Sequence, residues 1–195
     1  MKVLSALSLA CALALGGCAA DHTRAAREVP VRVVLSGTAE PAEAVASLLA
    51  DADAAQGDPK RLGAILAALD AFGARPMAGE ADPVATWRSK AAIPKTPPYR
   101  GRVLGPAYKA GMLNPGATVR LPQLFDGGRS ARVAVATPGQ AGLDFTVLDG
   151  EAKPVCPPAK ARTRECMWTP LFSGRFEIVL TNPSSNAAGY YLVID

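Results

Sequence analysis

The spacing of apolar residues predicts a strand and two helices in the first part of the chain. Apolar and polar residues alternate over 31–35, as in a half-buried strand, and Pro30 favours an edge position. Two sets of apolar residues then recur at helical spacing. They are Val45, Leu48, Leu49 and Ala52, and then Leu62, Ile65, Leu66, Leu69 and Phe72. Because residues 56–59 (QGDP) can end one helix and begin the next, the pattern predicts a helical hairpin.

In the second half of the chain the apolar residues alternate with polar ones, which is typical of strands. The alternating positions are Val119 and Leu121; Val133 and Val135; Leu143, Phe145 and Val147; Phe176, Ile178 and Leu180; and the run 190–194. Turns rich in Gly, Asn and Pro separate these runs. We therefore expect roughly seven to nine strands over residues 103–195, in an antiparallel β-sandwich or jelly roll. The predicted fold class is mainly β, with an N-terminal αα-hairpin before the sandwich.

Residues 76–102 contain five prolines and are interpreted as a linker, because proline interrupts long helices and central strands. A short helix is predicted from Asp82 to Lys90. Trp87 lies within it and is expected to pack on the neighbouring domain rather than to face a ligand. The preceding hairpin, in the segment 29–75, is expected to cover one side of the sandwich, with binding of a partner as the alternative.

The N-terminus has the pattern of an export signal. Lys2 precedes an uncharged apolar run that is too short to span a bilayer. The run ends in Leu15-Gly16-Gly17-Cys18, which resembles the lipobox of bacterial lipoproteins. The resemblance implies cleavage after residue 17 and lipidation of Cys18. Cys11 fits less well, because Ser8 stands where the lipobox has Leu. An ordinary secretory signal that ends near a cysteine is the alternative.

A lipid on Cys18 would anchor the protein to a membrane, and residues 18–28 would form a tether. Ala19 follows the lipidated position, and in lipoproteins of Gram-negative bacteria a residue other than Asp there implies sorting to the outer membrane. We therefore expect the protein to be attached to the outer membrane and to face the periplasm.

Composition limits the chemistry of the chain. A formal net charge of +4, from 21 Lys and Arg against 17 Asp and Glu, gives no indication of nucleic-acid binding. The one histidine, His22, lies in the predicted tether. Serine and cysteine nucleophiles would therefore lack a well-placed base, and zinc sites that need two histidines are excluded. Motifs for phosphate or dinucleotide binding are absent, so we expect no cofactor and no metal.

Cys156 and Cys166 are expected to form a disulfide, since they are a pair in a protein predicted to enter an oxidising compartment. Trp168 would point to the same face as Cys166 in a strand, and we expect it to pack against the bridge. Three basic residues in and beside the enclosed loop are candidates for binding anionic envelope polymers. They are Lys160, Arg162 and Arg164. A solvated basic loop is the alternative.

The C-terminal half resembles the bacterial pre-peptidase C-terminal domain. The resemblance rests on residues 142–150 (GLDFTVLDG), 168–170 (WTP), 174–179 (GRFEIV) and 190–194 (YYLVI). It implies a β-sandwich that serves as a non-catalytic accessory module of secreted and envelope proteins, sometimes with bound calcium. Here Leu143-Asp144-Phe145 departs from the family's acidic pair, so a calcium site is not carried over.

Two functions follow from these observations. The favoured one is a non-enzymatic envelope lipoprotein with an accessory, binding or structural role toward an envelope protein or an anionic polymer. The alternative is a small envelope hydrolase that uses carboxylates, because Asp and Glu occur throughout the chain. A hydrolase would need two acids that converge in a concave pocket, whereas a docking module would present an apolar or basic surface.

Overall fold

The computed structural model describes residues 41–91, 93, 105–139, 142–161 and 163–195. These residues all belong to one structural unit, Val31–Asp195, and the strand predicted over 31–35 lies outside them. The predicted signal peptide and tether, with Cys18 and His22, also lie outside the described residues, as does Arg162.

Three helices form the first part of this unit, and local sequence signals explain their ends. They are α1 (Pro41–Ala54), α2 (Pro59–Phe72) and α3 (Pro83–Arg88). The Asp58 carboxylate accepts a hydrogen bond from the Arg61 amide at 3.1 Å and caps α2. Gly73 ends α2 in the left-handed conformation, at φ 66°. The helical hairpin is confirmed, and α3 ends two residues before the predicted limit at Lys90.

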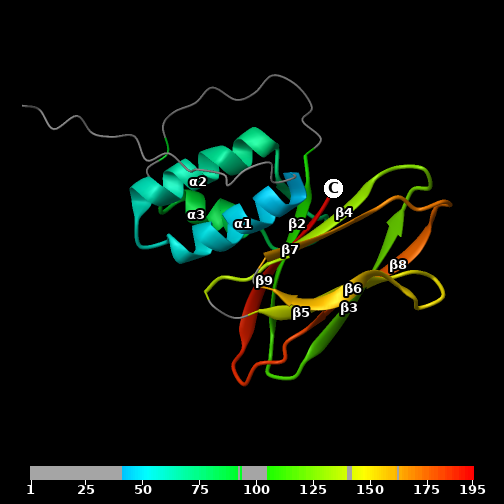
Figure 1. Cartoon of the computed structure of the whole chain (residues 1–195). Helices are drawn as coiled ribbons and strands as arrows, with labels where there is room; N and C mark the ends of the chain where they lie inside the picture. The colour runs from blue at the N-terminus through cyan, green and yellow to red at the C-terminus, as the bar shows by residue number, and fades with distance from the viewer. Residues whose placement is uncertain (1–40, 92, 94–104, 140–141, 162) are drawn as a thin grey trace, which may run out of the picture. The chain divides into compact units, whose positions relative to one another are not determined.

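Nine strands in the described residues form two sheets (Figure 1). Sheet A contains, in spatial order, β1 (Arg75–Pro76), β2 (Ala107–Leu113), β9 (Ala188–Ile194), β4 (Ala131–Ala136) and β7 (Thr163–Trp168). Sheet B contains β3 (Thr118–Phe125), β8 (Gly174–Thr181), β5 (Leu143–Leu148) and β6 (Pro154–Ala161).

The antiparallel pairs are nested along the chain. β2 pairs with β9, β3 with β8, β4 with β7, and β5 with β6. This nesting is the topology of a jelly roll, and β1 adds a short parallel strand at the edge beside β2. The predicted sandwich or jelly roll is therefore confirmed.

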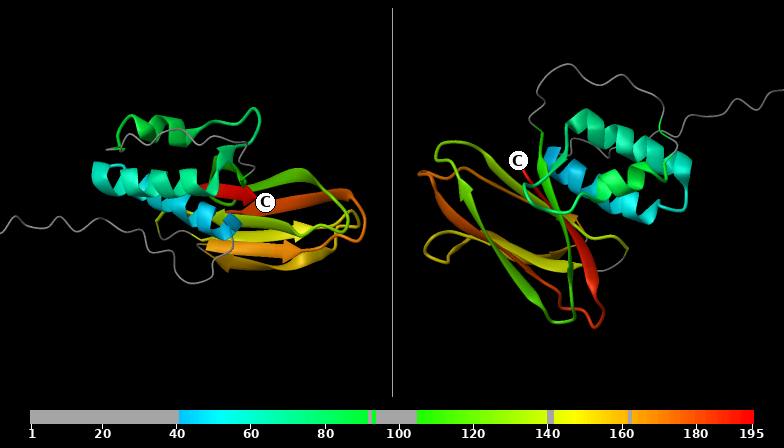
Figure 2. Two further views of the ribbon diagram at one scale, coloured as in Figure 1. Left: turned by 90° about the horizontal axis from the view of Figure 1, so that it is seen from above. Right: turned by 180° about the vertical axis from the view of Figure 1, so that it is seen from behind.

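Sheet A is buried on both faces. Its inner face, with Val133, Val135 and Leu192, packs against Phe145 and Ile178 of sheet B. The helices cover its outer face, where Ala134, Ala136, Tyr191 and Val193 share a core with residues of α1 and α2. Figure 2 shows the helices on this one side of the sandwich. The prediction that the hairpin covers the sandwich is confirmed.

Part of the stretch interpreted as a linker packs closely on sheet A. The Met77 amide donates to the Tyr108 carbonyl at 2.8 Å, which continues the pairing of β1 with β2. Trp87 of α3 is buried and meets the Tyr191 ring edge-on, with ring centroids 5.9 Å apart. The prediction that Trp87 packs inward is confirmed. Proline does not prevent this packing, because Pro76 lies in an edge strand and Pro83 in the first turn of a helix.

The Cys156–Cys166 disulfide is present and joins the two sheets. Cys156 lies on β6, the edge of sheet B, and Cys166 on β7, the edge of sheet A, with Cα atoms 5.9 Å apart. The described residues that the bridge encloses belong to these two strands rather than to an irregular loop. Trp168 belongs to the apolar cluster that contains both cysteines, as expected for packing near the bridge. Its ring meets Phe125 edge-on and Phe176 at a tilt, at centroid distances of 4.8 and 5.3 Å.

Replacing both cysteines (Cys156→Ala with Cys166→Ala) should lower the free energy of unfolding by roughly 2–3 kcal/mol, because the unfolded chain loses a crosslink. Urea denaturation of the oxidised proteins measures the difference. Reductant should destabilise the unsubstituted protein by a similar amount and leave the double variant unchanged. Equal stability of the oxidised protein and the variant would contradict a stabilising role for the bridge.

Three buried tyrosines couple the core to pH. Burial raises the pKa of Tyr108, and so does its hydrogen bond to the Asp82 carboxylate at 2.6 Å. Burial also raises the pKa values of Tyr190 and Tyr191, the latter with a contribution from Asp53. These phenols stay protonated in the folded protein at pH values where unfolded tyrosine, with a pKa of about 10, ionises.

The stabilisation from these phenols should be complete below about pH 10 and should decrease as the pH rises above that value. Urea unfolding across the alkaline range measures this decrease. Tyr108→Phe keeps the ring and removes the ionisable group, so the variant should lose stability less steeply with pH. An identical alkaline slope in the variant would show that Tyr108 is not one of the groups responsible.

Candidate functional site

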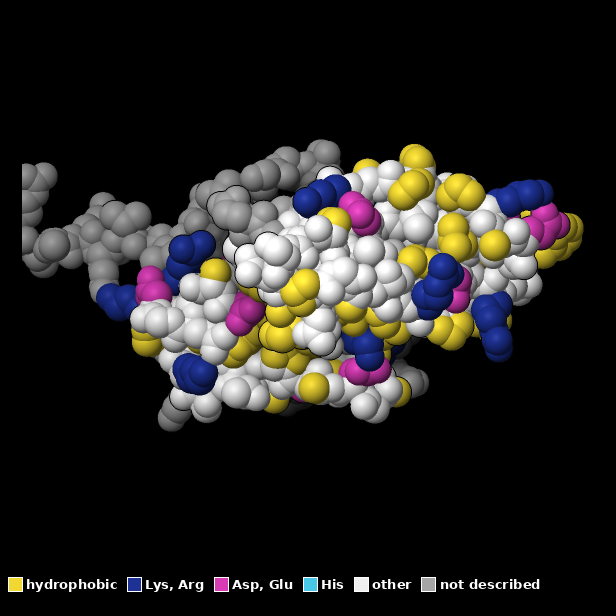
Figure 3. Space-filling model, turned by 90° about the horizontal axis from the view of Figure 1, so that it is seen from below, with side chains coloured by type: hydrophobic (Ala, Val, Ile, Leu, Met, Phe, Trp, Pro, Cys, Tyr) yellow, Lys and Arg dark blue, Asp and Glu magenta, His cyan; other side chains and the backbone are white. Residues whose placement is uncertain are grey.

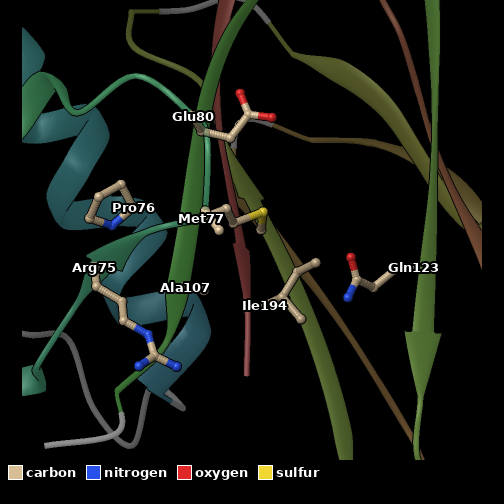
Figure 4. Close-up of a pocket in the computed structure, with 8 residues that line it drawn as sticks. Arg75, Pro76, Met77, Glu80, Ala107, Gln123 and Ile194 are labelled. Carbon is tan, nitrogen blue, oxygen red and sulfur yellow. The ribbon is translucent and has the colours of Figure 1, made fainter.

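A hollow in the sandwich lies on the side opposite the disulfide, between β3, an edge of sheet B, and the β1–β2 end of sheet A. Its volume is ≈ 650 Å³. The residues that line it are Arg75, Pro76, Met77, Ala78, Glu80, Ala107, Gln123 and Ile194 (Figure 4). They come from the β1 segment, from β2, from β9 and from β3, so the jelly-roll topology assembles the hollow from four separate parts of the chain.

Backbone pairing fixes one wall of the hollow. The Arg75 amide donates to the Pro106 carbonyl at 3.1 Å, and Met77 follows it in the same parallel pairing. A turn then closes through a hydrogen bond from the Glu80 amide to the Met77 carbonyl, and Gly79 takes a left-handed conformation within it at φ 80°. The wall therefore has a defined conformation against β2.

The hollow continues toward the core through a smaller cavity of ≈ 150 Å³. The two share Met77, Glu80, Gln123 and Ile194. The inner cavity adds apolar residues of the core, including Leu121, Ile178 and Leu192. The site is therefore apolar where it adjoins the core, while Glu80 and Gln123 line both cavities, and such a mixture is typical of ligand-binding clefts.

The charges of the site leave one positive side chain, that of Arg75, among the residues that line the larger hollow. Glu80 forms an ion pair with Lys109, which balances the one carboxylate among the lining residues. Within the described part of the chain, no hydrogen bond or ion pair of the Arg75 guanidinium or the Gln123 amide to another side chain is seen. Figure 4 shows the Gln123 amide directed toward Ile194 across the hollow. The arrangement suits binding of an anionic or amide-containing group beside apolar residues.

The acids of the described residues do not form a shielded catalytic pair in this hollow. A separate hollow of ≈ 210 Å³ is lined by Asp126 and Asp195, but Asp126 lies 3.7 Å from Arg129 and is well exposed to solvent. No cluster of three or more potential metal ligands occurs among the described residues. The described geometry therefore offers general acid–base chemistry less support than it offers binding.

The basic residues predicted to bind anions are placed on different sheets. Lys160 lies on β6 opposite Asp144 of β5, and Arg164 lies on β7. The Arg164 guanidinium donates to the Pro157 carbonyl at 2.7 Å, so it also ties β7 to β6. Because Arg162 is outside the described residues, anion binding by these three residues stays a prediction.

Sequence patterns did not identify the residues of the hollow. Arg75 and Gln123 are isolated polar residues, and Glu80 lies in the stretch interpreted as a linker. They come together only because β1 pairs with β2 and β3 faces that pair from the other sheet. The one sequence signal was Ile194, which belongs to the alternating run at the end of the chain.

Comparisons with known proteins gave structural likenesses only. No family model and no curated protein sequence matches this chain. The pre-peptidase C-terminal domain of collagenase from Bacillus anthracis matches 45% of this chain and 87% of its own, at 12% identity and a TM-score of 0.40. PliG, a periplasmic inhibitor of g-type lysozyme from Aeromonas hydrophila, matches 46% and 84%, at 17% identity and a TM-score of 0.35.

The Yersinia pseudotuberculosis-derived mitogen also matches 46% of this chain and 84% of its own, at 14% identity and a TM-score of 0.39. Among the described helices, none is long and apolar enough to cross a membrane.

Proposed function

We propose that this chain is a non-catalytic binding module of the bacterial envelope, anchored to the outer membrane through a lipid on Cys18 and facing the periplasm. The observation that carries the binding role is the hollow between β2 and β3. Its lining includes Arg75 and Gln123 beside apolar residues of the core, and the carboxylate of Glu80 is ion-paired with Lys109. Such a site is suited to holding a ligand.

The size and charge of the hollow favour a segment of an anionic envelope polymer as the ligand. A volume of ≈ 650 Å³ lies in the range of small-molecule sites, so it fits a short segment rather than a folded partner. The planar guanidinium of Arg75 can bind a carboxylate through two parallel hydrogen bonds. Carboxylates of peptidoglycan stem peptides have this chemistry.

The disulfide supports an envelope location, because disulfides persist in oxidising compartments and are rare in the cytosol. The sequence at 15–18 supports lipid anchoring by its resemblance to a lipobox. The hydrolase alternative has less support, since the hollow that holds Arg75 presents only one carboxylate among its lining residues.

Arg75→Ala combined with Gln123→Ala should weaken co-sedimentation with purified peptidoglycan at low salt by about 10-fold or more, because a hydrogen bond to a charged group is worth roughly 1.5–3 kcal/mol. Arg61→Ala removes an exposed arginine from α2 and is the matched control, which should bind normally. If only the triple change of Lys160, Arg162 and Arg164 to Ala weakens binding, the ligand site lies at β6 and β7 and the proposal for the hollow is wrong.

Cys18→Ser should abolish incorporation of a clickable palmitate analogue in a bacterial host and should release the protein from the membrane fraction. Cys11→Ser is the matched control, because it changes another cysteine of the same leader and should leave labelling unchanged. Labelling that persists in Cys18→Ser, or that is lost only in Cys11→Ser, would contradict anchoring at Cys18.

A further inference from the structure

One end of the sandwich exposes two large apolar side chains. Leu171 and Phe172, which we call the apolar tip, lie between β7 and β8 and are 87% and 83% exposed. Figure 3 shows hydrophobic side chains together with basic and acidic ones at the right-hand end, where Figure 1 places the connections from β7 to β8 and from β3 to β4. Adjacent exposed apolar side chains are more informative than single ones, because contiguous apolar patches mark interaction sites.

The backbone of the apolar tip is held in a fixed position. The Gly128 amide donates to the Pro170 carbonyl at 2.7 Å, and the Gly127 amide donates to the Ser173 hydroxyl at 2.9 Å. The connection from β3 to β4 approaches so closely that a Cβ on Gly127 would lie 2.7 Å from the Phe172 Cα. The two side chains are therefore presented by a braced turn.

Basic side chains flank the tip. Arg129 lies in the adjoining connection and is well exposed, although it is 3.7 Å from Asp126. Arg175 on β8 is exposed and stands opposite Leu124 of β3, which is itself 67% exposed. A projecting apolar pair between arginines matches a bilayer surface, where acyl chains lie beneath anionic phosphate groups.

We propose that the apolar tip inserts into the lipid bilayer surface to which Cys18 is anchored, and that Arg129 and Arg175 contact the lipid phosphates. Two projecting side chains cannot supply the roughly 800 Å² per partner that a stable protein interface needs. Burial of Leu171 and Phe172 in acyl chains removes apolar surface from water and needs little contact area.

This inference rests on the proposed lipid anchor, because insertion of two side chains is too weak to hold a free protein on a membrane. Anchoring makes the contact intramolecular and raises its effective concentration. Residues 19–40 connect Cys18 to α1, and a chain of that length reaches at most roughly 80 Å. In Figures 1 and 2 the start of α1 lies beside the C-terminus, and Asp195 shares a hollow with Asp126 and Arg129 near the tip.

The test uses the full lipidated protein, reconstituted into vesicles of phosphatidylethanolamine and phosphatidylglycerol that carry bromine on the acyl chains, which quenches nearby indoles. Phe172→Trp places a reporter at the tip with little change in packing, since Phe172 is exposed. Met112→Trp is the matched control, because Met112 is 72% exposed. It pairs with Gly189 near one end of β2, whereas the other end of β2 pairs with Ile194. The unsubstituted protein gives the background from Trp87 and Trp168.

The brominated lipid should quench most of the fluorescence added by Phe172→Trp and little of that added by Met112→Trp. Combining Phe172→Trp with Arg129→Gln and Arg175→Gln should reduce the quenching, as should replacing phosphatidylglycerol with phosphatidylcholine. Vesicle-bound protein with equal or no quenching of the two reporters would overturn the tip proposal and leave the anchor intact.

Protein that does not associate with vesicles at all would overturn the anchor and, with it, the tip proposal. Shielding of the Phe172→Trp reporter by periplasmic extract in place of lipid would also overturn it, since the occupant of the tip would then be a protein.

Discussion

The burial of sheet A on both of its faces is the constraint on which the rest of the structure depends. Along β9, Tyr190 and Leu192 face the other sheet, while Tyr191 and Val193 face the helices. This sheet therefore belongs to two apolar cores at once, and the helices cannot separate from the sandwich without exposing one of them to water. The β1 segment pairs with β2 at the edge of this sheet and forms one wall of the hollow.

The two sides of the sandwich differ in how they are closed. On one side the edge strands β6 and β7 are linked covalently by the disulfide. On the other side β1 and the turn that contains Gly79 cover only part of the gap between β2 and β3. This asymmetry explains why the hollow lies on the side without the disulfide. A cleft needs sheet edges that are separated from each other and fixed in position.

Periodicity predicted the elements that bury alternate or helical faces, and it failed where residues have other roles. The hairpin and five of the sandwich strands followed from spacing, and the disulfide followed from a cysteine pair in a predicted oxidising compartment. The strands β1, β2, β6 and β7 were missed, since β1 has only two residues, β6 contains Pro157 and Pro158, and the glycine at 111 interrupts β2. Their pairing is set by contacts distant in sequence, which also explains why Arg75 and Gln123 had no detectable signal as site residues.

The central claim is that the hollow between β2 and β3 holds a segment of an anionic envelope polymer. Nuclear magnetic resonance of the isotope-labelled protein, titrated with soluble peptidoglycan fragments, tests it most directly. The account predicts saturable shifts of the Gln123 side-chain amide and of the Ile194 backbone amide, with little change at the disulfide edge. Shifts confined to Lys160, Arg164 and their neighbours on β6 and β7 would contradict it.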